Sequence, residues 1–360
     1  MTEKLNRFLQ VPMGTETIYI EEAYKHRQAN EELGKLFTSW GYLPVETPVF
    51  DFFDIYQDFI PALKDIYRLI DREGDLLMLR SDITLFLAKQ MGLSLKETDL
   101  PVRICYSGTI LRHQNREDIS KNEFFQTGVE LIGKEDSNAD LEILMLLNST
   151  FNSLEIKPIV HIGSRKLLNA SVSDFNNSDK KQIMSMISYR NFENLKNKLK
   201  EKNDKERINF LTNLFQFIGT PEELKTLIDS SEKVIIKEEL TALNDLILIM
   251  ESLSKLNVDS DFIIDLSEVG NQSYYTGIVF QGYIEGVDSA VVSGGRYDNL
   301  LGQFGFEAPS VGFSLLLRKV ENQLGKKFSL PDHENIDDKN FIDAYRKAEK
   351  IRKNGRIAIL

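Results

Sequence analysis

Two long apolar segments on either side of a short charged loop constrain the fold more than any other feature of the sequence. The segments are VRICYSGTILRHQ (102–114) and NEFFQTGVELIG (122–133), and the loop between them is NREDISK (115–121). Both segments are rich in β-branched and aromatic residues. The pattern therefore predicts a long antiparallel hairpin.

The rest of the chain divides into parts of different character. Helix and strand patterns alternate over 1–165, and strands return over 258–320 in FIIDLS, YYTGIVFQGYI and SAVVSGG. Helix formers dominate 166–257, where Thr220 in TPEEL has the features of a helix N-cap followed by proline and a capping-box glutamate. We interpret 166–257 as a helical insertion. The tail, 321–360, is predicted to be a polar linker (PDHENIDD), one helix and a strand-like RIAIL.

The composition argues against several classes of function. The 360 residues include 44 Lys and Arg against 55 Asp and Glu, a net charge of −11, which disfavours a broad nucleic-acid surface. The single cysteine, Cys105, excludes an internal disulfide, and the four histidines show no metal-ligand spacing. Phosphate-binding glycine motifs are absent, which removes P-loop and Rossmann mechanisms. No stretch is long and apolar enough for a membrane span, so we expect a cytoplasmic protein. We also expect neither a cofactor nor a metal ion.

The second strand of the hairpin carries the first candidate site. A period of two puts Gln126, Gly128 and Glu130 on one face, while Val129 and Leu131 are on the core face. A glycine between an amide and a carboxylate leaves room for a small ligand, and Glu130 could receive an ammonium group. Equally, Gln126 and Glu130 could simply face solvent. The strand pattern does not decide between these interpretations.

Arg112, on the first strand of the hairpin, is a candidate anion-binding group. Its planar guanidinium can bind a carboxylate or a phosphate through two parallel hydrogen bonds. Taken alone, a surface salt bridge to Glu117 or Asp118 in the acidic loop is the simpler interpretation.

Tyrosines mark two later segments. In SYYTGIVFQGY the strand period puts Tyr275 on one face and Tyr274 on the other, a pattern typical of one core ring and one surface ring. In VVSGGRYDNLL, Gly294 and Gly295 predict a turn from strand to helix, with Tyr297 at the helix start and its hydroxyl free.

The order of these segments resembles the class II aminoacyl-tRNA synthetases. The amphipathic helix and the Pro48 strand resemble motif 1, GTILRHQ…NEFFQTGVELIG resembles motif 2, and SVGFSLLLRKV stands where motif 3 would. More narrowly, LRSDIT, FFQTGVE, SYYTGIVF and SGGRYDNLLGQFG resemble histidyl-tRNA synthetase over residues 5–320. The resemblance implies an α+β fold, with a class II synthetase-like antiparallel sheet flanked by helices, built from 1–165 and 258–320.

The resemblance also implies a histidine-binding pocket. In LRSDIT, Asp82 replaces the family's glutamate, and Thr84 is kept. Acidic side chains in such a pocket suit an ammonium group, while the amide and the tyrosine hydroxyls suit an imidazole edge. The residues carried over to this pocket are Asp82, Thr84, Arg112, Gln126, Glu130, Tyr275 and Tyr297.

The departures from the synthetase pattern fall on the activation chemistry. Gly270 stands where the synthetase has an arginine that works in histidine activation, and Gln114 follows Arg112 in place of an acid. Arg318-Lys319 occupies the place of the motif 3 Glu-Arg pair, with Leu315 in place of a glycine. The synthetase arginines at the positions of Gly270 and Lys319 are thus absent from this chain. An ATP site without them loses charge stabilisation for the departing pyrophosphate. No catalytic residue is assigned.

This combination resembles the family of ATP phosphoribosyltransferase regulatory subunits, paralogues of histidyl-tRNA synthetase in histidine biosynthesis. The resemblance implies that the chain is not an enzyme by itself. Instead it is needed by a separate short-form catalytic subunit, with histidine as feedback effector bound either in the synthetase-like pocket or at the subunit interface. It also implies a homodimer, formed through segment 18–50, within a hetero-octamer. The tail resembles only a truncated βα segment of the synthetase's anticodon-binding domain.

Two other functions remain open. A divergent histidyl-tRNA synthetase would show histidine-dependent ATP–pyrophosphate exchange. Another amino-acid-adenylating or amide-forming enzyme would need the same ATP site. The replacements at Gly270 and Lys319 count against both.

Overall fold

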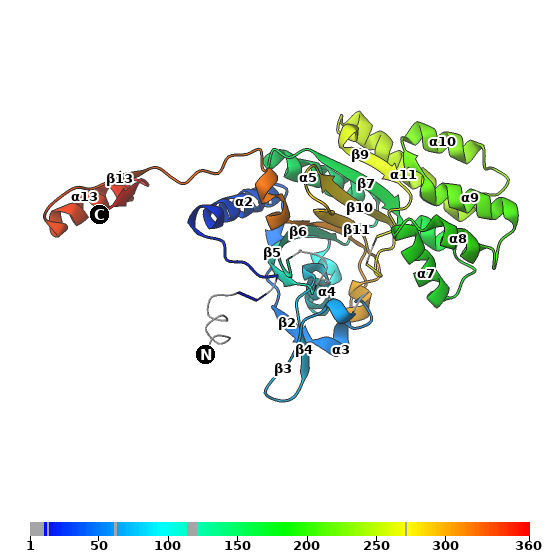
Figure 1. The fold of residues 1–360 in the computed structure, drawn as a ribbon, viewed down its shortest axis with the longest axis horizontal. Coiled ribbons are helices and arrows are strands. Elements are labelled where there is room, and N and C mark those ends of the chain that lie inside the picture. Colours follow the sequence, from blue (N-terminus) through cyan, green and yellow to red (C-terminus); the bar gives the residue numbers. More distant parts are fainter. Residues whose placement is uncertain (1–10, 13, 61–62, 114–120, 271) are drawn as a thin grey trace, which may run out of the picture.

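The architecture is known from a computed structural model, which describes residues 11–12, 14–60, 63–113, 121–270 and 272–360. A nine-stranded sheet forms its centre, with strand order β1-β5-β6-β12-β11-β10-β7-β9-β8 (Figure 1). The strands are β1 (Leu43–Pro44), β5 (Val102–Leu111), β6 (Glu123–Ile132), β7 (Pro158–Ser164), β8 (Ile218–Gly219), β9 (Phe262–Asp265), β10 (Ile278–Ile284), β11 (Val292–Arg296) and β12 (Ser310–Leu316).

The sheet is antiparallel except at two pairs, β1–β5 and β7–β9. Strands β5 and β6 pair over ten residues, from Val102 opposite Ile132 to Leu111 opposite Glu123. This register confirms the predicted hairpin, and the large antiparallel sheet with flanking helices confirms the predicted fold class.

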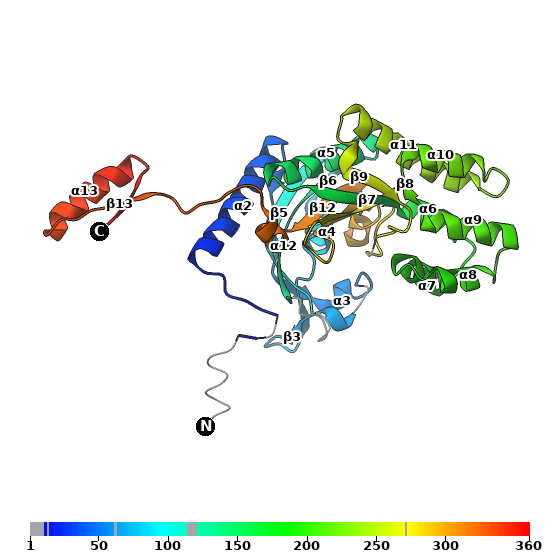
Figure 2. The ribbon, with the colours of Figure 1, turned by 45° about the horizontal axis from the view of Figure 1, so that its top comes forward.

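Three helices cover one face of the sheet: α2 (Ile20–Ser39), α5 (Ser137–Ser153) and α11 (Lys237–Lys255) (Figure 2). The helical period places Leu33 and Phe37 of α2 on one side, where both are buried. Phe37 meets the ring of Phe313 on β12 edge-on, with centroids 6.3 Å apart. From β6, Val129 and Leu131 join this core and are fully buried, as the strand period predicted.

A second, smaller core covers the opposite face. It contains α4 (Ile83–Ser94), α3 (Phe53–Tyr56) and a three-stranded sheet of β2 (Phe50–Phe52), β4 (Leu76–Leu79) and β3 (Arg68–Ile70). Tyr56 of α3 stacks on Phe86 of α4, with ring centroids 4.8 Å apart. The polar pocket described below lies within this second core.

The segment between β7 and β9 is mostly helical and lies at one end of the sheet (Figure 1). Its helices before α11 are α6 (Arg165–Ser171), α7 (Asn177–Ser188), α8 (Phe192–Leu199), α9 (Lys205–Gln216) and α10 (Pro221–Asp229). Thr220 caps α10 as predicted: its Oγ1 accepts the Glu223 amide at 3.3 Å, and its own amide donates to the Glu223 carboxylate at 2.8 Å.

The C-terminal residues form a small unit away from the sheet, beyond the short helix α12 (Leu317–Val320) (Figure 1). It contains β13 (His333–Asn335), α13 (Phe341–Lys353) and β14 (Ile357–Ile359), and the two strands pair in parallel. The prediction of a polar linker at PDHENIDD was therefore wrong for its middle part, because the three-residue strand β13 lies inside it. This strand is held by backbone pairing to β14, and its polar side chains gave no apolar alternation to detect.

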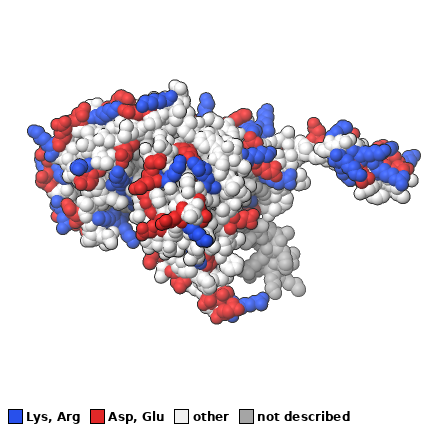
Figure 3. All heavy atoms as spheres, turned by 180° about the vertical axis from the view of Figure 1, so that it is seen from behind, with Lys and Arg blue, Asp and Glu red and all other residues white. Residues whose placement is uncertain are grey.

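Charged residues of both signs are interleaved over the face of the body shown in Figure 3, while basic side chains gather on the C-terminal unit. Lys350, Arg352 and Lys353 occupy the last turn of α13, where cations complement the helix dipole. Within the described part of the chain, no helix combines the length and the apolar character that a membrane span requires.

Candidate functional site

Glu130 is the centre of a closed polar cluster on β6. Only 1% of the residue is exposed, and three hydroxyl groups donate to its carboxylate. Thr84 Oγ1 is 2.7 Å and Tyr106 Oη 3.3 Å from Oε1, while Tyr297 Oη is 2.6 Å from Oε2. Gln126 is equally buried. The interpretation that Gln126 and Glu130 simply face solvent is therefore excluded.

The environment of Glu130 changes its ionisation. Burial in a site without a cationic partner raises the pKa of the carboxyl to about 8, and the hydroxyl donors and the nearby Asp82 only modify this. Glu130 is therefore mostly protonated at neutral pH while the pocket is empty. A ligand ammonium group placed here would favour the ionised form, since an opposite charge lowers the pKa of a carboxyl.

The start of helix α4 forms one wall of the cluster. Asp82 caps this helix by accepting the Leu85 amide at 3.3 Å, and Gln126 Oε1 accepts the Ile83 amide at 2.9 Å. Gln126 therefore ties β6 to the helix that carries Thr84.

Arg112 lies beside this helix start. Its Nε donates to the Ser81 carbonyl at 2.7 Å, and its Nη2 is 3.3 Å from Asp82 Oδ2. The structure thus pairs Arg112 with a pocket residue. The structure does not describe residues 114–120. This range includes Glu117 and Asp118, the alternative partners of Arg112, and Gln114, which stands in place of the synthetase's acidic residue.

Tyrosines close the pocket, although not in the predicted way. Tyr274 and Tyr275 precede β10, which begins at Ile278, so the strand period does not separate them. The rings of Tyr274 and Tyr275 are 5.1 Å apart, and those of Tyr274 and Tyr297 are 5.6 Å apart. The prediction that Tyr274 points to the opposite face was wrong, because these residues lie in a loop rather than in a strand.

The prediction for the GG segment was also wrong. Gly294 and Gly295 lie within β11, and the hydroxyl of Tyr297 is bound to Glu130 rather than free. The glycines leave space for rings: a Cβ on Gly294 would be 2.4 Å from Phe280, and one on Gly295 would be 2.9 Å from Tyr275.

The sequence analysis missed several residues of the pocket, among them Tyr106, which donates to Glu130, and Tyr274, which lines the cavity. Tyr106 is opposite Gly128 in the hairpin register, and a Cβ on Gly128 would be 2.7 Å from the Tyr106 hydroxyl. The glycine between Gln126 and Glu130 was therefore a usable signal that a large cross-strand neighbour fills this space. No comparable signal marked Tyr274.

The cavity around Glu130 is very small in this structure. Its volume is about 10 Å³, and it adjoins an outer cavity of about 170 Å³ beside Asp82, Arg112, Gln272 and Tyr274. A single water molecule needs roughly 10–15 Å³. The segment 272–277 carries Tyr274 and Tyr275 and is called the tyrosine loop here. An amino-acid side chain can therefore reach Glu130 only if this loop moves. Cavities of about 700 and 590 Å³ lie beside α10–α11 and α2, away from this titratable cluster, so volume alone does not locate the site.

Among the predicted pocket residues, Asp82, Thr84, Glu130, Tyr275 and Tyr297 line the inner cavity. Arg112 lines the outer cavity together with Asp82, and Gln126 supports the wall through Ile83. The structure thus brings the predicted set together. That these residues bind histidine remains a prediction.

Gly270 is a departure from the synthetase pattern that the structure explains. It has a φ of +73°, and a Cβ there would be 2.6 Å from Cδ2 of Tyr275. An arginine side chain at this position is incompatible with the observed place of the Tyr275 ring. A buried arginine from another element, Arg165, instead donates to the carbonyls of Gly270 and Gln272 at 2.7 and 2.8 Å.

The basic pair that replaces the end of motif 3 points elsewhere. Lys319 Nζ donates to Ser289 Oγ at 2.7 Å and lies over the Phe124 ring, and Arg318 is 3.9 Å from the Glu16 carboxylate. Neither residue lines the cavities around Glu130. In the described part of the chain, no group of three or more His, Cys, Asp or Glu side chains is arranged to hold a metal ion.

Comparison with known proteins gives consistent matches. Residues 14–320 match the family described as histidyl-tRNA synthetase. A protein of Clostridium kluyveri described as an ATP phosphoribosyltransferase regulatory subunit is 31% identical over 369 aligned positions, which cover 97% of this chain and 92% of that protein.

Solved structures show the same fold. A Bacillus halodurans protein described as an ATP phosphoribosyltransferase regulatory subunit/histidyl-tRNA synthetase superposes with a TM-score of 0.86 at 26% identity, covering 98% of this chain and 92% of that one. Histidyl-tRNA synthetase from Nostoc sp. PCC 7120 gives a TM-score of 0.77 at 21% identity, covering 97% and 85% of the two chains.

Proposed function

The chain belongs to the family of ATP phosphoribosyltransferase regulatory subunits, which have the histidyl-tRNA synthetase fold, and we propose that it senses histidine for a separate catalytic subunit. In this role it has no catalytic activity of its own. It is required for ATP phosphoribosyltransferase activity, the first step of histidine biosynthesis, and for inhibition of that activity by histidine.

The observation that carries the proposal is the buried carboxyl of Glu130 among three hydroxyl groups. Burying a carboxyl group costs free energy unless hydrogen bonds satisfy it, and in this pocket the hydroxyl groups do so. A ligand ammonium group is the natural partner for this carboxyl, and the tyrosine hydroxyls can bind an imidazole nitrogen. Arg112, in the outer cavity, can receive the ligand's carboxylate.

Two replacements support the proposal that this chain does not activate an amino acid with ATP. Gly270 packs against Tyr275 and leaves no room for an arginine, while Lys319 lies away from the pocket. Adenylation needs positive charge where pyrophosphate leaves. This favours the regulatory role over a divergent synthetase or another adenylating enzyme.

Feedback inhibition follows from linkage. Histidine can inhibit only if it binds the inactive state of the complex more tightly than the active state. The nearly filled cavity supports such a difference, because binding at Glu130 has to displace the loop that carries Tyr274 and Tyr275. The signal would then pass from this loop to the catalytic subunit within a hetero-octamer.

The proposal is tested by reconstitution with a short-form ATP phosphoribosyltransferase catalytic subunit. We expect activity only when this chain is added, and inhibition by histidine. Glu130→Gln should keep the activation but weaken the inhibition by about tenfold or more, because the amide cannot become an anion for the ammonium group. Full histidine sensitivity in Glu130→Gln would place the effector elsewhere.

A second assay separates the alternatives. Clear histidine-dependent ATP–pyrophosphate exchange by the isolated chain would overturn the regulatory proposal and support a divergent synthetase. Exchange with a different amino acid would instead identify another adenylating enzyme.

A further inference from the structure

Arg296 lies behind the pocket, on the other face of the central sheet. In the strand register Gly295 is opposite Gly312, which is opposite Glu130, so these three positions share the pocket face. Arg296 is opposite Val311 and points to the helix-covered face. It is 6% exposed, although it carries a permanent charge.

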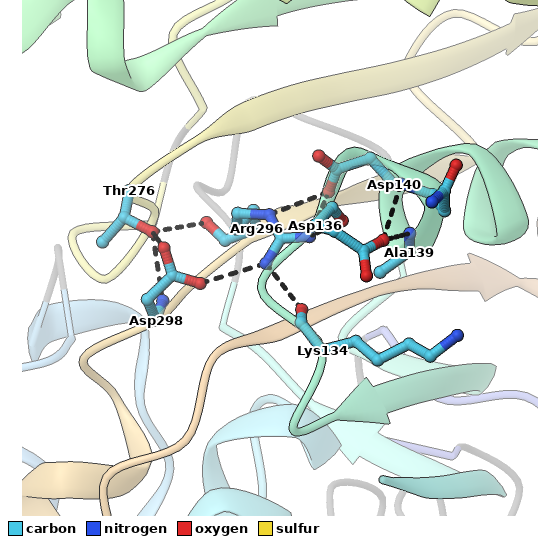
Figure 4. A network of polar contacts seen from close by, with 8 residues as sticks. Lys134, Asp136, Ala139, Asp140, Thr276, Arg296 and Asp298 are labelled. Atoms are coloured by element: carbon cyan, nitrogen blue, oxygen red, sulfur yellow. Dashed lines mark hydrogen bonds and ion pairs between the residues drawn. The ribbon is translucent and has the colours of Figure 1, made fainter.

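The guanidinium of Arg296 binds the turn that follows β6 (Figure 4). Its Nε donates to Asp140 Oδ1 at 2.9 Å, its Nη1 to the Lys134 carbonyl at 3.0 Å, and its Nη2 to the Asp136 carbonyl at 3.3 Å. These three partners lie between the end of β6 and the first turn of α5. Arg296 thus fixes the segment that directly follows the strand of Gln126 and Glu130.

The same arginine reaches the loop of the pocket tyrosines through Asp298. Arg296 Nη1 is 3.3 Å from Asp298 Oδ1, and Asp298 Oδ2 accepts the Thr276 hydroxyl at 2.9 Å. The Asp298 amide donates back to Thr276 Oγ1 at 3.0 Å, and the Thr276 amide donates to the Arg296 carbonyl at 2.8 Å. Thr276 is adjacent in sequence to Tyr275, and Tyr297 lies between Arg296 and Asp298.

Packing supports the same link. A Cβ on Gly277 would be 2.8 Å from Cδ of Arg296, so the aliphatic stem of the arginine lies directly against the backbone of the tyrosine loop. One side chain therefore contacts three segments that adjoin pocket residues: the turn after β6, the loop that carries Tyr275, and Asp298 just after β11.

We propose that Arg296, together with Asp140 and Asp298, is a positioning unit for the ligand pocket. Arg296 lines a separate cavity of about 420 Å³ and neither of the two cavities beside Glu130. It holds Glu130, Tyr275 and Tyr297 at their mutual distances from the far side of the sheet, as supporting interactions do behind binding groups. The inference rests on the proposed function for its ligand, histidine, but its structural part can be tested without any ligand.

The alternative is that Arg296 contributes only to overall stability, and the chain offers a matched control for this. Arg207 on α9 forms a comparable buried pair with Glu239, at 2.6 and 2.7 Å, and also donates to the Val234 carbonyl at 2.8 Å. Glu239 is fully buried, and these residues belong to the helical segment rather than to the pocket. Arg296→Met and Arg207→Met each leave a buried carboxylate unpaired, which is strongly destabilising in both cases.

The experiment compares wild type, Arg296→Met, Arg207→Met and Asp298→Ala in the full chain. Asp298→Ala breaks the link to Thr276 but keeps the pair with Asp140, so it provides a variant that folds if Arg296→Met does not. Hydrogen exchange of the unliganded proteins, followed by mass spectrometry, should show faster exchange over 268–277 in Arg296→Met and Asp298→Ala, but not in Arg207→Met. Histidine affinity measured by calorimetry should fall about tenfold in the first two variants and stay within about twofold of wild type in the control.

Unchanged exchange over 268–277 in a folded Asp298→Ala variant would overturn the positioning role, as would an equal loss of affinity in Arg207→Met. If wild type binds no histidine, the proposed function fails, while the exchange measurement still decides the role of Arg296.

Discussion

Glu130 is satisfied within the chain, and this shapes what its pocket can do. In the empty state the hydroxyls of Thr84, Tyr106 and Tyr297 occupy the positions that a ligand's donors would take. Binding therefore exchanges internal hydrogen bonds for ligand hydrogen bonds. An ammonium group adds a charge pair, because it favours the ionised form of a carboxyl group that the empty site keeps mostly protonated. Such a site favours ligands that carry a cation and rejects neutral isosteres.

The raised pKa of Glu130 predicts a specific dependence of stability on pH. Between the ordinary carboxyl range and about 8, the folded state holds a proton that the unfolded state has lost. The free energy of unfolding should therefore fall as the pH rises through this interval, by up to about 1.4 kcal/mol per pH unit. Glu130→Gln removes this titration, so its urea-unfolding free energy should fall less steeply than wild type between pH 5 and 8.

Glu73→Gln provides the control, because it makes the same substitution at an exposed glutamate outside the pocket. Parallel pH profiles for wild type and Glu130→Gln would mean that the buried carboxyl is ionised in the empty pocket.

The side chains of the pocket were predictable to different degrees. Gln126 and Glu130 could be placed on one face because the strand period is two and their spacing is local. Tyr106 depends on the cross-strand register and Tyr274 on a loop conformation, and neither is set by neighbouring residues in the sequence. For the same reason, the hydrogen bond from the Tyr297 hydroxyl to Glu130 could be found only in the structure.

The loop before β10, which carries Tyr274 and Tyr275, is anchored at two places. It is held from the helical segment by Arg165, which donates to the carbonyls of Gly270 and Gln272, and from β11 by the contact between Thr276 and Asp298. Both anchors lie outside the cavity. The loop can therefore respond to the ligand inside and to rearrangements of neighbouring elements outside.

Gly270 is predicted to be required for this loop conformation. Gly270→Ala meets both a positive φ and the ring of Tyr275, whereas Gly74→Ala at φ +96° meets no atom within 4 Å. The Gly74 variant should lose about 1 kcal/mol of unfolding free energy from backbone strain alone. The Gly270 variant should lose more, and it should also bind histidine more weakly, because Tyr275 has to shift.

Calorimetric unfolding and histidine titration of the two variants check this prediction. Equal stability losses and equal affinities would show that the ring of Tyr275 adapts freely. Gly270→Arg should not restore pyrophosphate exchange, since the loop has no space for the side chain.

Predictability also differed among elements. The start of α10 was predicted correctly because its capping box is complete within TPEEL. Strand β13 was missed because its partner β14 is distant in the sequence and its own side chains are polar. The GG segment was misassigned as a turn because the reason for its glycines, the rings of Phe280 and Tyr275, lies on other elements.

At the scale of the whole molecule, the segment 18–50 exposes a group of large apolar side chains. One stripe of α2, with Ala29, Leu33 and Phe37, is buried. Several other large side chains of the segment remain exposed: Tyr19, Ile20, Leu43, Val49 and Phe50. Exposed apolar surface of this kind is typical of an interface. It supports the proposal that this segment, which resembles motif 1, joins two copies of the chain about a twofold axis.

Phe50→Asp should convert the proposed dimer into a monomer. Phe50 is 54% exposed in the single chain, and a twofold interface contains every residue twice. The loss of an interface aromatic side chain costs about 2 kcal/mol per copy, and two buried carboxylates would add to this. Light scattering coupled to size-exclusion chromatography should therefore give half the wild-type mass for Phe50→Asp. The matched control is Tyr189→Asp, because Tyr189 is an 83% exposed aromatic residue just after α7, and this variant should stay dimeric.

A dimer in Phe50→Asp, or a monomer in wild type, would place the subunit contact on another surface. If the dimer is the unit that assembles with the catalytic subunit, the monomeric variant should also fail to activate it.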